Sequence, residues 1–177
     1  MKIFLSRPAT HHYNRNVMKA APVASPKVMK VAFWAGLLVG TLDITDALVF
    51  YGLRGVPAGR ILQGIAFGLI GTSAFTLGTR SVVLGLLLHY FIAITAAAIY
   101  MLASLSLPLW RHPLLCGTLY GLAVYTVMNY MVLPLSHVGL RPIPAWIPLL
   151  NGLGALTFLV GIPLALIARR YLSPRRS

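Results

Sequence analysis

The sequence predicts an all-α protein: a polytopic transmembrane helical bundle of four spans with one glycine-rich re-entrant or interfacial segment. Of 177 residues, 58% are apolar and only 10% are charged, with a mean hydropathy of +0.82, whereas a soluble domain carries about 25% charged residues. The apolar residues gather in runs close to the roughly 20 residues that a helix needs to cross the hydrocarbon core. Fifteen Lys and Arg stand against two acids, and most lie at the chain ends or between the runs. That distribution is typical of membrane proteins, whose orientation follows their basic residues.

The expected elements follow in order along the chain. Residues 1–30 are basic and free of acids, and we expect a disordered tail on the cytoplasmic membrane surface, with an organellar transit peptide as the alternative. The transmembrane domain is expected over residues 31–170, followed by a second basic cytoplasmic tail at residues 171–177. The expected spans are residues 31–53, 82–105, 114–134 and 146–168, with a shorter segment at 61–79.

The later boundaries have their own signals. Leu107-Pro108 ends the second span and Pro134 closes the third, because proline lacks the N–H that a continuing helix needs. Arg169-Arg170 stops the last span. The segment 61–79 is shorter than the others and is interrupted by four glycines: Gly64, Gly68, Gly71 and Gly78.

The distribution of basic residues decides whether residues 61–79 cross the membrane. If they do not cross, eleven Lys and Arg lie on the side of the termini and four lie on the other side: Arg54, Arg60, Arg80 and Arg141. If they cross, the division is eight to seven. Cytoplasmic loops carry an excess of Lys and Arg, so the rule favours four spans with both termini cytoplasmic.

A possible internal duplication favours the alternative of five spans. Residues 52–58 (GLRGVPA) resemble residues 139–145 (GLRPIPA), and each is followed by a similar step, Leu62-Gln63-Gly64 or Leu150-Asn151-Gly152. If the likeness reflects a duplication, residues 61–79 correspond to the last span. The two halves would then form an inverted repeat, as in several transporter folds.

Small residues recur one helical turn apart, at a spacing that lets helix backbones approach closely. We expect these residues to form helix-packing faces or contacts within a homo-oligomer. The pairs are Gly36/Gly40, Gly64/Gly68, Ala93/Ala97 and Gly117/Gly121.

The only two acidic residues, Asp43 and Asp46, lie in the middle of the first expected span. A carboxylate in hydrocarbon costs several kcal/mol, so such residues normally face a bundle interior or a wet cavity. At a spacing of three residues they share one helix face. Because two close carboxylates cannot cheaply both ionise in a medium of low dielectric constant, the pair predicts a proton or cation site.

Other polar residues are expected at a similar depth. In the four-span arrangement Asp46, His89, Asn129 and Asn151 fall in the outer half of the bilayer, each on a different helix, and Asp43 lies about one turn deeper. We expect Arg54, Arg60 and Gln63 to cover this layer from outside, with Arg54 able to pair with an aspartate. The alternative is that these polar residues hold helices together, each contributing roughly a kcal/mol or less.

Several classes of chemistry lack their motifs. The sequence has no His-Glu-x-x-His pair, Walker loop or Rossmann fingerprint, and no nucleophile elbow. The single cysteine, Cys116, forms no intrachain disulfide. We therefore expect no cofactor and leave any metal undetermined. No basic stripe is interleaved with aromatic residues, so we expect no nucleic acid partner.

Three stretches together resemble small bacterial inner-membrane proteins of unassigned function, of the YagU-like type. They are residues 36–43 (GLLVGTLD), residues 112–121 (HPLLCGTLYG) running to Pro134-Leu-Ser, and Leu150-Asn-Gly running to Ala168-Arg-Arg170. The resemblance covers residues 31–170 and implies a bacterial inner-membrane setting with no known substrate. Such proteins often carry a histidine in the last span, where this chain has Leu153-Gly154-Ala155.

Three classes of function remain open. A proton, cation or small-solute pathway would use Asp43 and Asp46 as its titrating site. A structural or assembly subunit of a membrane complex would use the glycine faces, with anionic lipids held at the basic tails. A lipid-modifying membrane enzyme is the third class, and no catalytic residue is indicated for it.

Overall fold

The computed structural model describes residues 25–140 and 145–172, so most of both predicted tails and Arg141 lie outside the described residues. All regular elements in the described part of the chain are helical. In order they are α1 (Pro26–Gly52), α2 (Ala58–Ile70), η1 (Gly71–Phe75), α3 (Thr79–Ser106), η2 (Leu109–Arg111), α4 (Pro113–Val127), η3 (Met128–Val132), α5 (Leu133–Leu135), α6 (Trp146–Gly154), η4 (Ala155–Gly161) and α7 (Ile162–Leu172).

Within these ranges, four helical stretches are long and apolar enough to cross a membrane: Pro26–Gly52, Thr79–Ser106, Pro113–Leu135 and Trp146–Leu172. Their 23 to 28 residues correspond to about 35–42 Å at 1.5 Å per residue, more than the roughly 30 Å hydrocarbon core. The predicted all-α bundle of four spans is confirmed.

The first span begins earlier than the sequence predicts. Residues 26–30, which we expected in the disordered tail, form the first turns of α1. The start has a local cause, because the Ser25 hydroxyl accepts a hydrogen bond from the Val28 N–H and Pro26 occupies the first helical position. Proline is favoured there since its missing N–H is not needed.

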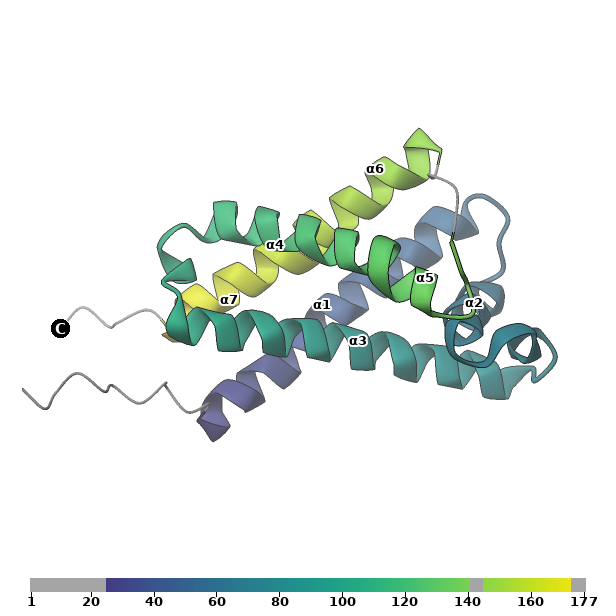
Figure 1. Ribbon diagram of the computed structural model, residues 1–177, viewed down its shortest axis with the longest axis horizontal. Helices are drawn as coiled ribbons and strands as arrows, with labels where there is room; N and C mark the ends of the chain where they lie inside the picture. The colour runs from purple at the N-terminus through teal and green to yellow at the C-terminus, as the bar shows by residue number, and fades with distance from the viewer. Residues whose placement is uncertain (1–24, 141–144, 173–177) are drawn as a thin grey trace, which may run out of the picture.

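The four spans alternate in direction, so α1 begins and α7 ends at the same end of the bundle (Figure 1). We call this the terminal end, and the opposite end, where α2 and the starts of α3 and α6 lie, the loop end. The outer faces of the spans carry exposed large apolar side chains, among them Phe91 at 68% and Phe158 at 67% exposure. Such faces are suited to lipid rather than to water.

Residues 61–79 do not cross the bundle, so the five-span alternative is wrong. The 13 residues of α2 reach only about 20 Å, and α3 then starts at the same end at which α1 finished (Figure 1). Gly71 and Gly78 have φ of +62° and +57°, a conformation that favours glycine. These two residues turn the chain back and produce the predicted re-entrant or interfacial segment.

α2 packs across the first turns of α3 at a glycine that the sequence pattern did not single out. A Cβ at Gly85 would collide with the Leu62 carbonyl and lie 3.4 Å from the Ala66 nitrogen. By contrast, a Cβ at Gly64 would meet nothing within 4 Å, and one at Gly68 would make only an ordinary contact with Ser136 at 3.6 Å. The α2 contact therefore depends on Gly85 of α3 and not on the glycines of α2.

The other glycine pairs lie at close helix contacts. A Cβ at Gly36 would be 2.5 Å from the Ile94 Cα, and one at Gly40 would be 2.9 Å from the Ala93 Cβ, so α1 packs closely on α3. Likewise α4 approaches the last span through two glycines: a Cβ at Gly117 would be 2.8 Å from the Gly161 carbonyl oxygen, and Gly121 faces the Leu156 carbonyl.

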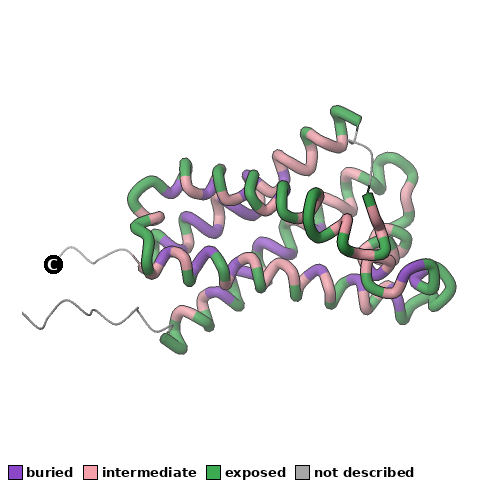
Figure 2. The backbone as a smooth tube through the Cα atoms, in the orientation of Figure 1, coloured by how far each residue is buried: buried purple, intermediate pink, exposed green. Residues whose placement is uncertain are grey.

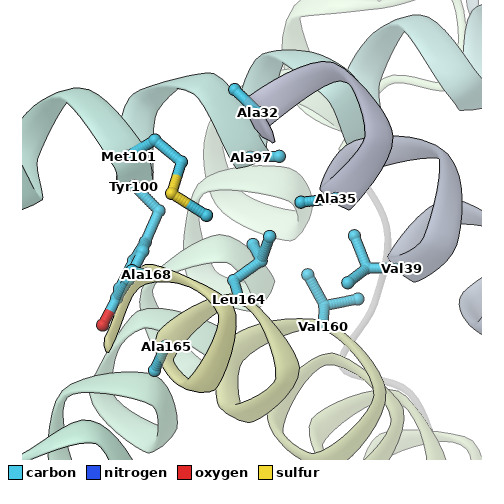
Figure 3. Close-up of a cluster of buried hydrophobic side chains, with 10 residues drawn as sticks. All are labelled: Ala32, Ala35, Val39, Ala97, Tyr100, Met101, Val160, Leu164, Ala165 and Ala168. Carbon is cyan, nitrogen blue, oxygen red and sulfur yellow. The ribbon is translucent and has the colours of Figure 1, made fainter. Parts of the chain in front are cut away.

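A compact apolar core fills the half of the bundle near the terminal end. Figure 2 shows buried residues concentrated where α1, α3, α4 and α7 meet. Leu164 lies in the middle of this cluster (Figure 3). The members are Ala32, Ala35, Val39, Ala97, Tyr100, Met101, Val160, Leu164, Ala165 and Ala168. The small alanine side chains of α1 and α7 allow these helices to pack closely in this half.

Candidate functional site: a polar cavity near the loop end

The half of the bundle near the loop end is hollow. It contains a cavity of about 670 Å³ whose walls come from every span and from Ile65 of α2. Val39 and Val160 line it and also belong to the apolar core, so the packed core forms its floor. Toward the loop end the lining includes Tyr51 and Tyr130, which are exposed.

All five residues that the sequence predicts for the site line this one cavity: Asp43, Asp46, His89, Asn129 and Asn151. They come from α1, α3, the η3 part of the third span, and α6. The structure therefore brings together the residues that the sequence predicts for one layer. Side chains distant in sequence meet because the four helices alternate in direction and each carries its polar residue in the same layer.

Asp46 is joined to the last span by a hydrogen bond. The Asn151 Nδ2 donates to the Asp46 Oδ2 at 2.8 Å, and both side chains are partly buried. Asp43, one turn earlier on the same face of α1, also lines the cavity and has no hydrogen-bond partner among the described residues. The two carboxylates therefore differ, since one is held by an amide and the other is available to a ligand.

His89 connects α3 to α1. Its Nε2 lies 2.7 Å from the Gly40 carbonyl oxygen, and a carbonyl only accepts, so Nε2 carries a proton. Because Gly40 has no side chain, α1 can lie close enough to α3 for this hydrogen bond. A Cβ at Gly40 would contact Ala93 and Tyr90 of α3. His89 is only 9% exposed, and its Nδ1 has no partner within the described ranges.

Two π-helical segments border the cavity, and the sequence analysis missed both. They are η3 and η4, and Asn129, Ala155 and Leu156 in them contribute to the lining. Such segments are rare and occur often at functional sites. In η3 the Asn129 Nδ2 donates to the Tyr125 carbonyl oxygen at 2.9 Å.

A signal for these segments exists in the sequence. Each π segment ends two residues before a proline that lies inside the helix: Val132 precedes Pro134, and Gly161 precedes Pro163. The proline ring clashes with the carbonyl one turn earlier and supplies no N–H, so the preceding turn widens. The third span ends at Leu135, one residue after Pro134, close to the predicted boundary.

The polar cover expected over the site does not form. Arg54 donates from Nη1 to the Phe50 carbonyl oxygen at 2.8 Å, and its guanidinium lies 3.6 Å from the centre of the Phe50 ring. Arg60 lies over the Phe75 ring at 3.9 Å. The Gln63 Nε2 donates to the Gly78 carbonyl and to Ser81, both at 3.4 Å. These three side chains find partners close to their own helices, and none lines the cavity.

The described residues contain no group of three or more His, Cys, Asp or Glu side chains arranged to hold a metal ion. The chain matches no family model, no curated protein and no solved structure. Fold and site define the class of the protein: it is a multi-pass helical membrane protein with a largely apolar cavity between its spans that carries two carboxylates.

Proposed function

We propose that the protein is a membrane pathway for a proton, a cation or a small cationic solute, with Asp43 and Asp46 as the binding carboxylates. One observation carries the proposal. The only two acidic side chains of a chain with a net charge of +13 both line a single cavity in the middle of the bundle. A carboxylate is expensive at this depth, and intramembrane acids mark ion and proton paths by default.

The uneven packing of the bundle also supports a pathway. The cavity occupies the half near the loop end, and the apolar core closes the other half. A cavity in one half of the bundle, with the other half packed, is the arrangement expected of one state of an alternating-access cycle. Passage of a solute would require the contacts around Leu164 to open.

We further propose that the terminal end faces the cytoplasm. Among the described residues, five Lys and Arg lie at the terminal end and three at the loop end, and the two flanking tails add six more basic residues in sequence. The positive-inside rule favours this orientation. A bacterial inner membrane follows from the resemblance to YagU-like proteins, and anionic lipids would neutralise the basic tails.

Cysteine labelling tests the orientation. In a Cys116→Ser background, Thr79→Cys at the loop end is expected to react with an impermeant maleimide added to intact cells, whereas Arg111→Cys is expected to react only after lysis. The reverse pattern would place the terminal end outside and overturn the orientation.

The function is tested by charge movement in proteoliposomes on a solid-supported membrane. Concentration jumps of H⁺, Na⁺, K⁺ and small alkylammonium ions are applied to purified protein, and we expect a transient current for at least one of them. Asp43→Asn and Asp46→Asn are each expected to reduce that current at least tenfold, since the charge is lost at constant shape. Thr45→Ala is the matched control, because Thr45 lies on α1 between the acids but does not line the cavity and bonds only the Thr41 carbonyl. A current absent for all four cations, or retained by both Asn variants, would refute the pathway.

A structural or assembly role is the second candidate, and the bond between Asp46 and Asn151 favours it. Interhelical hydrogen bonds of this kind stabilise bundles, and the close glycine contacts serve the same end. A subunit of this type would dock a second copy or another membrane protein. Asp46→Asn separates the two roles, because the amide oxygen of the variant still accepts from Asn151 whereas the charge is removed.

A further inference from the structure

The charged side chains that line the cavity indicate the sign of the charge on its ligand. Asp43 and Asp46 are acidic, and no Lys or Arg of the described residues is among the lining side chains. Arg54 and Arg60, the two basic residues at the loop end between α1 and the first turn of α2, lie against the rings of Phe50 and Phe75 instead. Two carboxylates with no Lys or Arg beside them in the lining favour a positively charged ligand in a medium of low dielectric constant.

The size of the cavity indicates that this ligand is organic. A volume of about 670 Å³ falls within the range of roughly 300–1,000 Å³ that is usual for small-molecule sites, far above what a proton or a bare metal ion occupies. The described side chains offer no cluster of three metal-ligating groups. Most of the wall is apolar, with Ile92, Val124 and Leu156 among its members.

Aromatic side chains line the same cavity. Tyr51, Tyr125 and Tyr130, from the first and third spans, are among its lining residues; Tyr125 is buried, whereas Tyr51 and Tyr130 are exposed. The face of a tyrosine ring attracts an ammonium group, and aromatic cages are a common solution for quaternary ammonium ligands. Asp43 and the Nδ1 of His89, neither of which has a hydrogen-bond partner among residues 25–140 and 145–172, provide the polar end of such a site.

We propose that the cavity binds a hydrophobic organic ammonium ion, whose charged group lies at Asp43 and whose apolar body lies among the tyrosines and the aliphatic wall. This inference rests on the proposed function and names the class of its substrate. Asp46, held by Asn151, supplies long-range attraction, and Asp43 makes the direct contact.

Calorimetric titration of the full chain in detergent micelles or nanodiscs tests the inference with two probes of equal shape. Benzyltrimethylammonium is expected to bind at one site per chain, whereas neopentylbenzene, its uncharged carbon isostere, is expected to bind at least tenfold more weakly. Asp43→Asn is expected to weaken the ammonium probe about tenfold or more and to leave the neutral probe unchanged. Tyr51→Leu is expected to weaken the ammonium probe severalfold, Tyr51→Phe to retain it because the ring face remains, and Thr45→Ala to leave it unchanged.

Equal binding of the charged and neutral probes, or ammonium binding that survives Asp43→Asn, would overturn the inference. The two proposals fail separately. Aspartate-dependent currents with H⁺, Na⁺ or K⁺ but no binding of benzyltrimethylammonium would refute the organic ligand and leave the pathway standing. Asp43-dependent binding without current for any cation would refute the pathway and leave a binding site. A variant with altered binding is compared with wild type by size-exclusion chromatography, so that loss of the fold is recognised directly.

Discussion

Gly121→Ala is expected to destabilise the bundle by about 2 kcal/mol or more. A Cβ at this position would lie 2.6 Å from the Thr157 Cα and closer still to the Leu156 carbonyl, whereas non-bonded carbon atoms prefer separations of 3.5–4.0 Å. The opposing atoms are backbone, which cannot rotate away as a flexible side chain would. Helices α4 and η4 would therefore have to separate along their contact.

The loss is measured by thermal unfolding in detergent with a thiol-reactive dye, which reports exposure of Cys116, the partly buried and only cysteine. The matched control is Gly154→Ala, because a Cβ there would meet nothing within 4 Å and alanine favours helix over glycine. We expect the control to be as stable as wild type or slightly more so. Equal stability of the two variants would show that α4 and η4 do not approach closely at Gly121.

Asn151→Leu is expected to destabilise the protein by about 1–3 kcal/mol. The substitution removes the donor that lies 2.8 Å from the Asp46 carboxylate and leaves that partly buried acceptor without its protein partner. Asp46→Asn is expected to stay close to wild type, since an amide oxygen accepts the same bond. The double variant Asp46→Leu/Asn151→Leu is expected to recover most of the loss, because removing both partners leaves no unsatisfied polar group.

A double-mutant cycle of wild type, Asp46→Leu, Asn151→Leu and the double leucine variant measures the coupling between the two side chains. Unfolding in a graded series of a denaturing detergent supplies the free energies. Additive effects of the two leucine substitutions would contradict the hydrogen bond between Asp46 and Asn151. Strong coupling together with unchanged stability of Asp46→Asn would show that the hydrogen bond stabilises the fold. It would also show that the negative charge of Asp46 is not needed for stability.

Much of the architecture follows from the sequence because the membrane restricts the alternatives. Apolar runs of sufficient length must be helical there, since every backbone group has to be satisfied within its own segment. The eleven-to-four division of basic residues favoured four spans over five, and α2 proved too short to cross. The duplication suggested by Gly52–Ala58 and Gly139–Ala145 did not predict topology, because short stretches rich in Gly, Pro and Leu are shared by many loops between membrane helices.

The sequence predicts which residues belong to the candidate site, but it does not predict the shape of the cavity. Placing each polar residue by its distance from the span ends brought Asp46, His89, Asn129 and Asn151 into one layer, and the four line one cavity. The same reasoning put Arg54 over the site. That reasoning did not consider that the flexible Arg54 side chain can find partners on its own helix. Its guanidinium donates to the Phe50 carbonyl and lies over the Phe50 ring.

The sequence by itself determined the helical nature of the spans, favoured four of them, and indicated the layer in which the polar side chains lie. These properties depend on apolar length, charge and the rise per residue, which act locally along the chain. Only the tertiary structure decided that Gly85, and not Gly64, forms the α2 contact, and that the half near the terminal end is packed while the other half is hollow. Those features depend on how side chains of different helices fill space together. The spacing of small residues within one helix does not indicate which helix packs against them. The contacts between helices therefore come from the tertiary structure alone.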